Sequence, residues 1–378
     1  MELALYCPNC GYYEREEDII GRRGDYYTSV SVGSLFGELL AFQFADWLEA
    51  WQRQSDEVTE AGLQGNMGKG GPMRIVEAGA HDGALARDIL AWLRQRRPSL
   101  YQRLEYWIVE PSERRQNRQR QNLREFGAQV RWVNSLAGLN AGSTSGIGPV
   151  QPAGWRGVFF SNELLDAMPV RRLGWDAKAR AWFEWGVTLR SGRLAWTRMV
   201  GANVAETDQW SSEPSAVSHS RIPFEDGTLG MLPDGFTIEL SPAAEHWWRA
   251  AALALRRGKL LTIDYGLTAE EFLVPERKEG TLRAYRRHRP SPDLLACPGE
   301  QDLTAHVNFT AIQAAGEATG LRTETFLTQA QFLTGIAARA WQDKGLFSEW
   351  TAERTRQFQT LVHPEHFGRS FRVLVQER

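Results

Sequence analysis

Short apolar runs that favour strands alternate with segments whose apolar residues recur at helical spacing, and this alternation constrains the fold more than any other feature. The pattern predicts strands at 73–79, 106–111, 130–133, 157–163 and 259–266, and helices at 84–97, 112–126 and 243–258, the last ending at Gly258. A final run at 371–378 predicts a strand that closes the sheet. Such alternation is typical of an α/β fold with a doubly wound, mostly parallel sheet.

The pattern divides the chain into four segments. Residues 1–55 form an N-terminal helical cap, 72–169 the first part of the α/β core, 170–237 an insertion between strands four and five, and 238–378 the second part of the core. The insertion is β-rich, because Arg180 to Met199 reads as antiparallel strands around the turn Ser191-Gly192. Two stretches rich in small residues, 55–72 and 138–154, are expected to be surface connections.

Composition excludes several classes of protein. The 378 residues are 42% hydrophobic and 24% charged, as in a folded globular protein, and the net charge of −2 provides no general attraction for nucleic acid. No apolar run reaches the roughly 18 residues of a membrane span, and the N-terminal pattern predicts a cytoplasmic location. Cys7 and Cys10 have metal-ligand spacing, but a second pair is missing, so we expect free thiols and no metal site.

The segment Ile75 to Gly83 predicts a strand, a turn of small residues and the start of a helix. Gly79 and Gly83 would let the backbone approach a ligand, and Glu77 could accept a hydrogen bond from a ligand ammonium group. A nicotinamide-binding turn prefers G-x-G-x-x-G, whose middle glycine is missing here. Glu77, two positions before Gly79, suits a cofactor that carries an amino acid better than one that carries a pyrophosphate. A turn without any ligand is the structural alternative.

Polar residues also end the second and fourth strands. Glu110 could accept hydrogen bonds from both hydroxyls of a ribose, although a solvated carboxylate is the alternative. Asn162, Glu163 and Asp166 follow the fourth strand, where they could orient a nucleophile. Asn162 would also suit a helix N-cap, and Asp166 fits a structural role equally well.

Longer motifs make the chain resemble one known family, the MidA-like methyltransferases. The matching stretches are ALYCPNCGYY from Ala4, GRRGDYYTS from Gly21, LFGELLA from Leu35, Glu77 to Gly83, SNELLDAMPVR from Ser161, IELSPAAEHW from Ile238, LLTIDYG from Leu260, GTLRAYRRHR from Gly280, PGEQDLTAHVNF from Pro298 and HFGRSFRVL from His366. The resemblance spans nearly the whole chain. Cys10, Val30, His81 and Asn308 depart from the family pattern.

The resemblance implies a seven-stranded class I methyltransferase sheet, S-adenosyl-L-methionine as the cofactor, and a protein substrate carrying arginine, as in mitochondrial members that assist respiratory complex I assembly. It adds Asp264, Asp302 and His306 as site candidates. Without the resemblance, the local sequence predicts that the chain passes from a strand into a turn at Asp264 and that Glu300 to Asp302 cap a helix. It also allows His306 to be a histidine that packs against a helix.

The predicted activity is therefore S-adenosyl-L-methionine-dependent methylation of a protein arginine. We expect the cofactor to contact Glu77, Gly79, Gly83, Glu110, Asn162 and Asp264. Glu163 and Asp166 are the first candidates to hold the substrate, followed by Asp302 and His306. Three alternatives stay open: a methyltransferase for a small molecule or another side chain, an assembly protein that keeps the fold without turnover, and a nicotinamide-linked oxidoreductase, which the missing glycine disfavours.

Overall fold

The computed structural model describes residues 1–15, 28–60, 73–141, 155–199, 232–286, 289–342, 345 and 347–378. The chain forms two compact units, each built from separate stretches of sequence. We call the first the accessory unit; it contains Met1–Asp18, Leu165–Trp248 and Tyr265–Ala315. We call the second the sheet unit; it contains Ile19–Leu164, Arg249–Asp264 and Gly316–Arg378.

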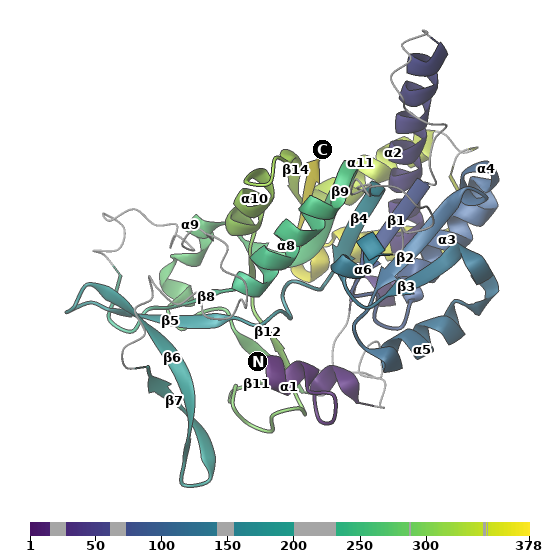
Figure 1. The fold of residues 1–378 in the computed structure, drawn as a ribbon. Helices are drawn as coiled ribbons and strands as arrows, with labels where there is room; N and C mark the ends of the chain where they lie inside the picture. Colours follow the sequence, from purple (N-terminus) through teal and green to yellow (C-terminus); the bar gives the residue numbers. More distant parts are fainter. Residues whose placement is uncertain are drawn as a thin grey trace. The chain divides into compact units, whose positions relative to one another are not determined.

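The sheet unit contains the strands that the alternating pattern predicts and the helices predicted at 84–97 and 112–126 (Figure 1). Its elements are η2 (Val30–Val32), α2 (Leu35–Glu60), β1 (Met73–Ala78), α3 (Ala84–Arg96), α4 (Pro98–Tyr101), β2 (Leu104–Val109), α5 (Glu113–Asn122), η3 (Arg124–Gln129), β3 (Val130–Val133), α6 (Leu136–Ala141), β4 (Trp155–Asn162), most of β9 (Leu255–Leu267), β14 (Arg322–Thr328), α11 (Gln329–Gln342), α12 (Ala352–Val362), η5 (Pro364–Gly368) and β15 (Phe371–Glu377).

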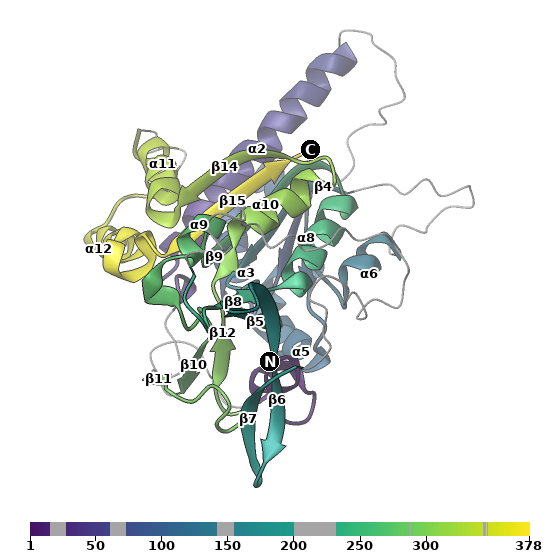
Figure 2. The same cartoon turned by 90° about the vertical axis from the view of Figure 1, so that its left-hand side faces the viewer.

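The strands pair in the order β14-β15-β9-β4-β1-β2-β3. Neighbours from β9 to β3 run parallel, and β14 pairs with β15 in the antiparallel sense. An eighth strand, β13 (Val307–Asn308), pairs with the end of β9. Figure 2 shows β14, β15 and β9 side by side. This arrangement confirms the mostly parallel, seven-stranded sheet expected from the sequence, with β13 as an addition.

Helix α3 and strand β4 show how the apolar pattern determines packing. Leu85, Ile89 and Leu93 recur at helical spacing in α3, and all three are buried. α2 packs against α3, and its Phe44 contacts Phe160 of β4, with 5.1 Å between ring centroids. The apolar residues of the central strand thus meet the apolar faces of the helices.

The predicted helix end at Gly258 is wrong, because Gly258 lies inside a strand. Helix α8 (Pro242–Ala254) ends earlier, and β9 begins at Leu255. A Cβ atom on Gly258 would lie 1.9 Å from the carbonyl oxygen of Gly157 in β4, and one on Gly157 would lie 1.9 Å from that of Arg74 in β1. Both glycines have positive φ, at 142° and 147°. Their bare backbones let the three central strands approach.

The accessory unit is built around two small antiparallel sheets, ordered β7-β6-β5-β8 and β11-β10-β12. Its elements are mostly short. They comprise α1 (Glu2–Tyr6), η1 (Tyr12–Glu14), β5 (Arg171–Asp176), β6 (Ala181–Arg190), β7 (Arg193–Arg198), β8 (Thr237–Leu240), α9 (Ala269–Phe272), η4 (Pro275–Arg277), β10 (Arg283–Arg286), β11 (Arg289–Ser291), β12 (Asp302–Thr304) and the first part of α10 (Phe309–Glu317). β6 and β7 form a long hairpin that turns at Ser191-Gly192, as the sequence predicts (Figure 1).

The division into units differs from the four predicted segments. Residues 1–55 do not stay together, since Met1–Asp18 belongs to the accessory unit and the following residues to the sheet unit. The strands of the 170–237 segment also need a later partner, because β5 pairs with β8. Of the predicted connections, 61–72 and 142–154 lie outside the described residues. Among the described helices, none is both long and apolar enough to cross a membrane.

The close approach of the central strands gives a stability prediction. Gly157→Ala should destabilise the protein by about 3 kcal/mol or more, because the new methyl group would overlap a backbone oxygen. Gly335→Ala in α11 is the matched control, since its Cβ atom would meet nothing within 4 Å and alanine favours a helix. Urea unfolding of both variants measures the difference. Equal stability of the two variants would contradict the close approach.

Candidate functional site

The candidate cofactor residues follow strands whose ends lie side by side. In the sheet, Ala78 of β1 lies opposite Val109 of β2 and Ser161 of β4. Asn162 of β4 in turn lies opposite Ile263 of β9. The residues that come next, including Gly79, Glu110, Glu163 and Asp264, are therefore gathered at one edge. The carboxyl edge of a parallel sheet is where such folds bind their ligands.

The turn after β1 is built from left-handed residues. Gly79, His81 and Gly83 have φ values of 75°, 47° and 87°. A Cβ atom on Gly79 would approach Leu164 to 3.0 Å, and one on Gly83 would approach Leu123 to 3.1 Å. His81, which replaces a glycine of the family pattern, keeps the left-handed conformation at some cost in strain. The turn leads directly into α3, whose first N–H, that of Ala84, donates to Oδ1 of Asp82 at 3.0 Å.

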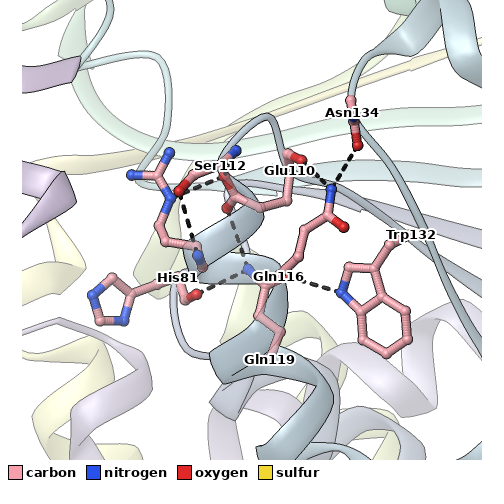
Figure 3. A network of polar contacts seen from close by, with 8 residues as sticks. His81, Glu110, Ser112, Gln116, Gln119, Trp132 and Asn134 are labelled. Atoms are coloured by element: carbon pink, nitrogen blue, oxygen red, sulfur yellow. Dashed lines mark hydrogen bonds and ion pairs between the residues drawn. The ribbon is translucent and has the colours of Figure 1, made fainter. Parts of the chain in front are cut away.

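Glu110 anchors a polar network beside this turn (Figure 3). Its side chain is only 2% exposed. Oε1 accepts hydrogen bonds from the backbone N–H of Ser112, at 3.0 Å, and from Nε of Arg115, at 2.9 Å. Oε2 accepts one from Nε2 of Gln119, at 3.2 Å. A carboxylate offers about four acceptor positions, so the Glu110 carboxylate keeps capacity for a ligand hydroxyl.

Two glutamines of α5 extend the network, and the sequence analysis missed both. Nε2 of Gln116 donates to the carbonyl oxygen of Glu110 and to Oδ1 of Asn134, both at 2.7 Å. Gln119 donates from Nε2 to the carbonyl oxygen of His81 and accepts from Nε1 of Trp132 (Figure 3). These glutamines are buried although the helix is strongly polar. Other amide side chains of the same helix, Asn117, Gln121 and Asn122, look alike in sequence, so no local signal separated these two.

Glu77 is a buried acid near the end of β1. It is 2% exposed, and its Oε2 accepts a hydrogen bond of 2.7 Å from the hydroxyl of Tyr106 in β2. Burial raises the pKa of Glu77 to about 8; Asp82 adds to the shift and the Tyr106 hydrogen bond opposes it. A ligand ammonium group nearby would favour the ionised carboxylate. Tyr106 was not predicted from the sequence, because its place in a strand looks like core packing.

Asn162, Glu163 and Asp264 form a second polar group at the same edge. Nδ2 of Asn162 donates to Oε1 of Glu163 at 3.0 Å, and Oε1 also lies 3.4 Å from the backbone nitrogen of Ser29. Asp264 Oδ2 accepts from the backbone N–H of Leu164 at 3.1 Å. Glu163 has a φ of 50°, unusual for a residue with a side chain. No helix follows Asn162, so it is not the N-cap that one interpretation allowed.

Asp166 and His306 lie in the accessory unit, joined through Tyr265. The Tyr265 hydroxyl donates to Oδ2 of Asp166 at 2.8 Å, and its ring meets the His306 ring edge-on at 5.3 Å. Burial lowers the pKa of His306 to about 4, and the charges of Arg277 and Arg283 add to this shift. His306 is therefore neutral at pH 7 and a weak proton acceptor.

Two further observations concern Asp302 and the surroundings of His306. Asp302 begins β12 and accepts a hydrogen bond of 2.8 Å from the Tyr13 hydroxyl, so the predicted helix cap is wrong. His306 and Asn308 line a cavity of about 20 Å³, which has room for about one water molecule. Asn308 accepts from the backbone N–H of Ala311 and so caps α10.

The predicted site residues thus fall into two groups. The sheet unit holds Glu77, Gly79, Gly83, Glu110, Asn162, Glu163 and Asp264, and the accessory unit holds Asp166, Asp302 and His306. The chain passes from one unit to the other between Leu164 and Leu165. The contacts given above for each group join residues of the same unit.

Comparison with known proteins identifies the family of the chain. Residues 39–327 match a family named "Putative S-adenosyl-L-methionine-dependent methyltransferase". The chain belongs to this family. It is an S-adenosyl-L-methionine-dependent methyltransferase with the class I sheet predicted from its sequence. The nicotinamide-linked alternative is thereby removed.

Curated relatives and a solved structure resemble nearly the whole chain. The Drosophila melanogaster relative, "Protein arginine methyltransferase NDUFAF7 homolog, mitochondrial", is 28% identical over 85% of this chain and 66% of its own length. The Danio rerio protein arginine methyltransferase NDUFAF7 is 24% identical over 98% of this chain and 80% of its own. A Burkholderia thailandensis crystal structure bound to S-adenosyl-homocysteine has a TM-score of 0.72 and 28% identity, covering 100% of this chain and 86% of that one.

The residues at the sheet edge fit S-adenosyl-L-methionine. Oδ1 of Asn162 is buried and has no hydrogen-bond partner among the described residues, so it can accept from a ligand donor. Gly79 and Gly83 present bare backbone at two positions of the turn. Glu110 keeps acceptor capacity for a ribose hydroxyl. Glu77 offers a carboxylate to an ammonium group. The donor and acceptor types therefore match an amino acid joined to a nucleoside.

The raised pKa of Glu77 predicts how stability depends on pH. A free glutamate titrates near ~4.3, so between that value and about 8 the folded protein binds one proton more than the unfolded chain. Without cofactor, the free energy of unfolding should fall as pH rises through this window, by on the order of 5 kcal/mol. Glu77→Gln should remove this part of the decline and be the more stable form at pH 8.

Urea unfolding at pH 5, 7 and 8.5 measures this effect. Glu105→Gln on the neighbouring strand is the control, because its carboxylate is paired with Arg74 and its removal should lower stability. A wild-type curve that stays flat over this range, or a Glu77→Gln variant less stable than wild type at pH 8, would argue against a buried, protonated Glu77.

The Glu110 network predicts the affinity for cofactor. Glu110→Ala should weaken the binding of S-adenosylhomocysteine by roughly 10- to 100-fold, because charged hydrogen bonds are lost. Glu105→Ala, another acid of β2 in an ion pair, should leave the affinity near wild type. Titration calorimetry compares the three proteins. Unchanged affinity in Glu110→Ala would exclude this carboxylate from the cofactor site.

Proposed function

We propose that this methyltransferase acts on the guanidinium group of an arginine side chain in a protein substrate. The names of the curated relatives support this proposal, since they are called protein arginine methyltransferases and match up to 98% of this chain. The observation that carries it is the carboxylate of Glu163, which leaves β4 at the cofactor edge in a left-handed conformation. Strained residues of this kind cluster at functional sites.

The chemistry of arginine explains why carboxylates are needed. A guanidinium group has a pKa above about 12 and carries only hydrogen-bond donors, so it must be held by acceptors and its charge balanced. Glu163 meets this requirement, because it is a carboxylate whose Oε1 is oriented by Asn162 and by the backbone of Ser29. Glu163 would then hold the substrate nitrogen and localise its positive charge.

The other candidates take secondary roles in this proposal. Asp166 is held by Tyr265 and Asp302 by Tyr13, and both stay secondary candidates within the accessory unit. His306, neutral at pH 7, could accept a hydrogen bond but is too weak a base to remove a proton from a guanidinium group. The proposal therefore relies on positioning and electrostatics.

When bound, S-adenosyl-L-methionine supplies a methyl group on a positively charged sulfur, already activated for transfer. In this proposal Glu77, Gly79, Gly83, Glu110, Asn162 and Asp264 hold it. Asp264 acts mainly by fixing the backbone of Leu164, next to Glu163. The remaining requirement is a fixed orientation of the acceptor nitrogen, which the Asn162 and Glu163 pair provides.

A cytoplasmic location remains a prediction from the sequence, and the word mitochondrial describes the relatives. The substrate test is incubation of the protein with methyl-labelled cofactor and a lysate of its source cell, followed by mass spectrometry. We expect label on an arginine of a protein. Label on a small molecule or another side chain would favour the alternative acceptor classes, and a lack of any label would favour an assembly protein.

Glu163 provides the mutational test of the proposal. Glu163→Gln keeps the volume of the side chain and removes its charge, so methyl transfer should slow by about a hundredfold while cofactor affinity stays nearly unchanged. Single-turnover methylation and cofactor titration measure these two effects. Equal rates in wild type and variant would remove Glu163 from the mechanism.

A second substitution separates function from folding at this position. Glycine accepts a φ of 50° without strain, so Glu163→Gly should unfold at the same or a higher temperature than wild type while losing turnover. A variant that loses both stability and turnover would indicate that Glu163 serves the fold.

A further inference from the structure

The Cys7-Pro-Asn-Cys10 loop brings two thiols together, and the methyltransferase site does not account for them. Sγ of Cys10 lies 3.0 Å from Sγ of Cys7, in hydrogen-bond contact. Cys10 is exposed and Cys7 is partly exposed, so small solutes can reach the pair. The sequence predicts free thiols here, and the structure adds that they are neighbours.

The backbone holds this loop in a closed form. The carbonyl oxygen of Cys7 accepts hydrogen bonds from the N–H of Cys10, at 3.2 Å, and of Gly11, at 2.7 Å. Tyr6 and Tyr13, on either side of the loop, stack with 5.6 Å between ring centroids. The two sulfurs therefore meet because the surrounding structure positions them, which favours reaction within the pair over reaction with a second molecule.

The loop is also fixed from outside by the Pro298 to Asp302 stretch of the same unit. Gly299 has a φ of 85°, and a Cβ atom there would lie 2.2 Å from the carbonyl oxygen of Cys10. Only a bare backbone fits against the loop at this point. The place of Cys10 is thus set by contacts on both sides.

The two thiols differ in character. The hydrogen bond from Cys10, together with the backbone N–H groups of Asn9, Cys10 and Gly11, lowers the pKa of the Cys7 thiol. The same side-chain hydrogen bond raises the pKa of the Cys10 thiol. Cys7 is the better nucleophile of the pair, and Cys10 holds its proton. This asymmetry matches the pairing of an attacking and a resolving thiol.

A zinc site explains the pair less well. Structural zinc takes four protein ligands. Within the described ranges, no cluster of three or more Cys, His, Asp or Glu side chains could hold a metal ion. Two thiols in contact, without further ligands, fit redox chemistry better.

We propose that Cys7 and Cys10 form a redox-active dithiol that is reversibly oxidised to an intramolecular disulfide by small-molecule disulfides such as oxidised glutathione. This inference does not depend on the identity of the methyl acceptor. The Cys7 thiolate attacks one sulfur of oxidised glutathione, forms a mixed disulfide and releases one glutathione thiolate. Cys10 then loses its proton, attacks the Cys7 sulfur and releases the second glutathione. Two protein thiols are oxidised and one glutathione disulfide is reduced to two thiols.

The experiment uses the full chain, reduced and then treated with oxidised glutathione, with free thiols trapped by alkylation before peptide mass spectrometry. In the wild type, the peptide with Cys7 and Cys10 should lose two hydrogens and keep no glutathione, and dithiothreitol should reverse this. Cys297→Ser, which removes the remaining exposed thiol, should behave as wild type. Cys10→Ser should retain glutathione on Cys7. In that variant, Cys7 should react at least about tenfold faster than Cys297.

Three results would overturn the proposal. One is glutathione that stays on Cys7 or Cys10 of the wild type without a disulfide between them. Another is equal reactivity of Cys7 and Cys297 in the Cys10→Ser variant. The third is stoichiometric binding of zinc by the reduced wild type that protects both thiols and disappears in Cys7→Ser and Cys10→Ser. Because the wild type and Cys297→Ser carry the main measurement, it does not require the other variants to fold.

Discussion

The parallel register of β1 with β2 and β4, and of β4 with β9, is the constraint on which the candidate site depends. It aligns Ala78 with Val109 and Ser161, so the polar residues that follow each strand meet at one edge. The register in turn requires close strand contact, which Gly157 and Gly258 allow because neither has a side chain. Residues far from the ligand thereby determine where its contacts lie.

At that edge, several residues have a burial or a backbone conformation that lowers the stability of the folded protein. Glu77 is buried with a raised pKa, and Glu163 and His81 have left-handed backbones. Each feature costs stability, and the surrounding strands and helices offset that cost. What these residues share is position: all three follow or end strands of the central sheet. Local rules of folding are thus broken at the edge that we propose holds the cofactor and the substrate.

The sequence predicted the sheet and the cofactor edge because both depend on local patterns. Periods of two and 3.6 residues placed the strands, and the glycines of the turn placed the ligand edge. Gly258 was misread as a helix end, since a glycine that ends a helix and one that allows strands to approach look alike in sequence. Gln116 and Gln119 were missed because their burial depends on β2, β3 and the turn after β1, all outside their own helix.

Polar contacts between distant parts of the chain could not be predicted from such patterns. Tyr13 and Asp302 are 289 positions apart, and Asp166 and Tyr265 are 99 apart, so no periodicity links them. The position after the fourth strand pointed to Asp166 as a candidate, whereas only the family resemblance pointed to Asp302. The two cysteines of the N-terminal loop are the opposite case. Their spacing brings both into one turn of backbone, but only the folded loop sets the 3.0 Å contact and makes one thiol the donor to the other. Spacing identifies candidates of this kind, and the surrounding backbone decides their chemistry.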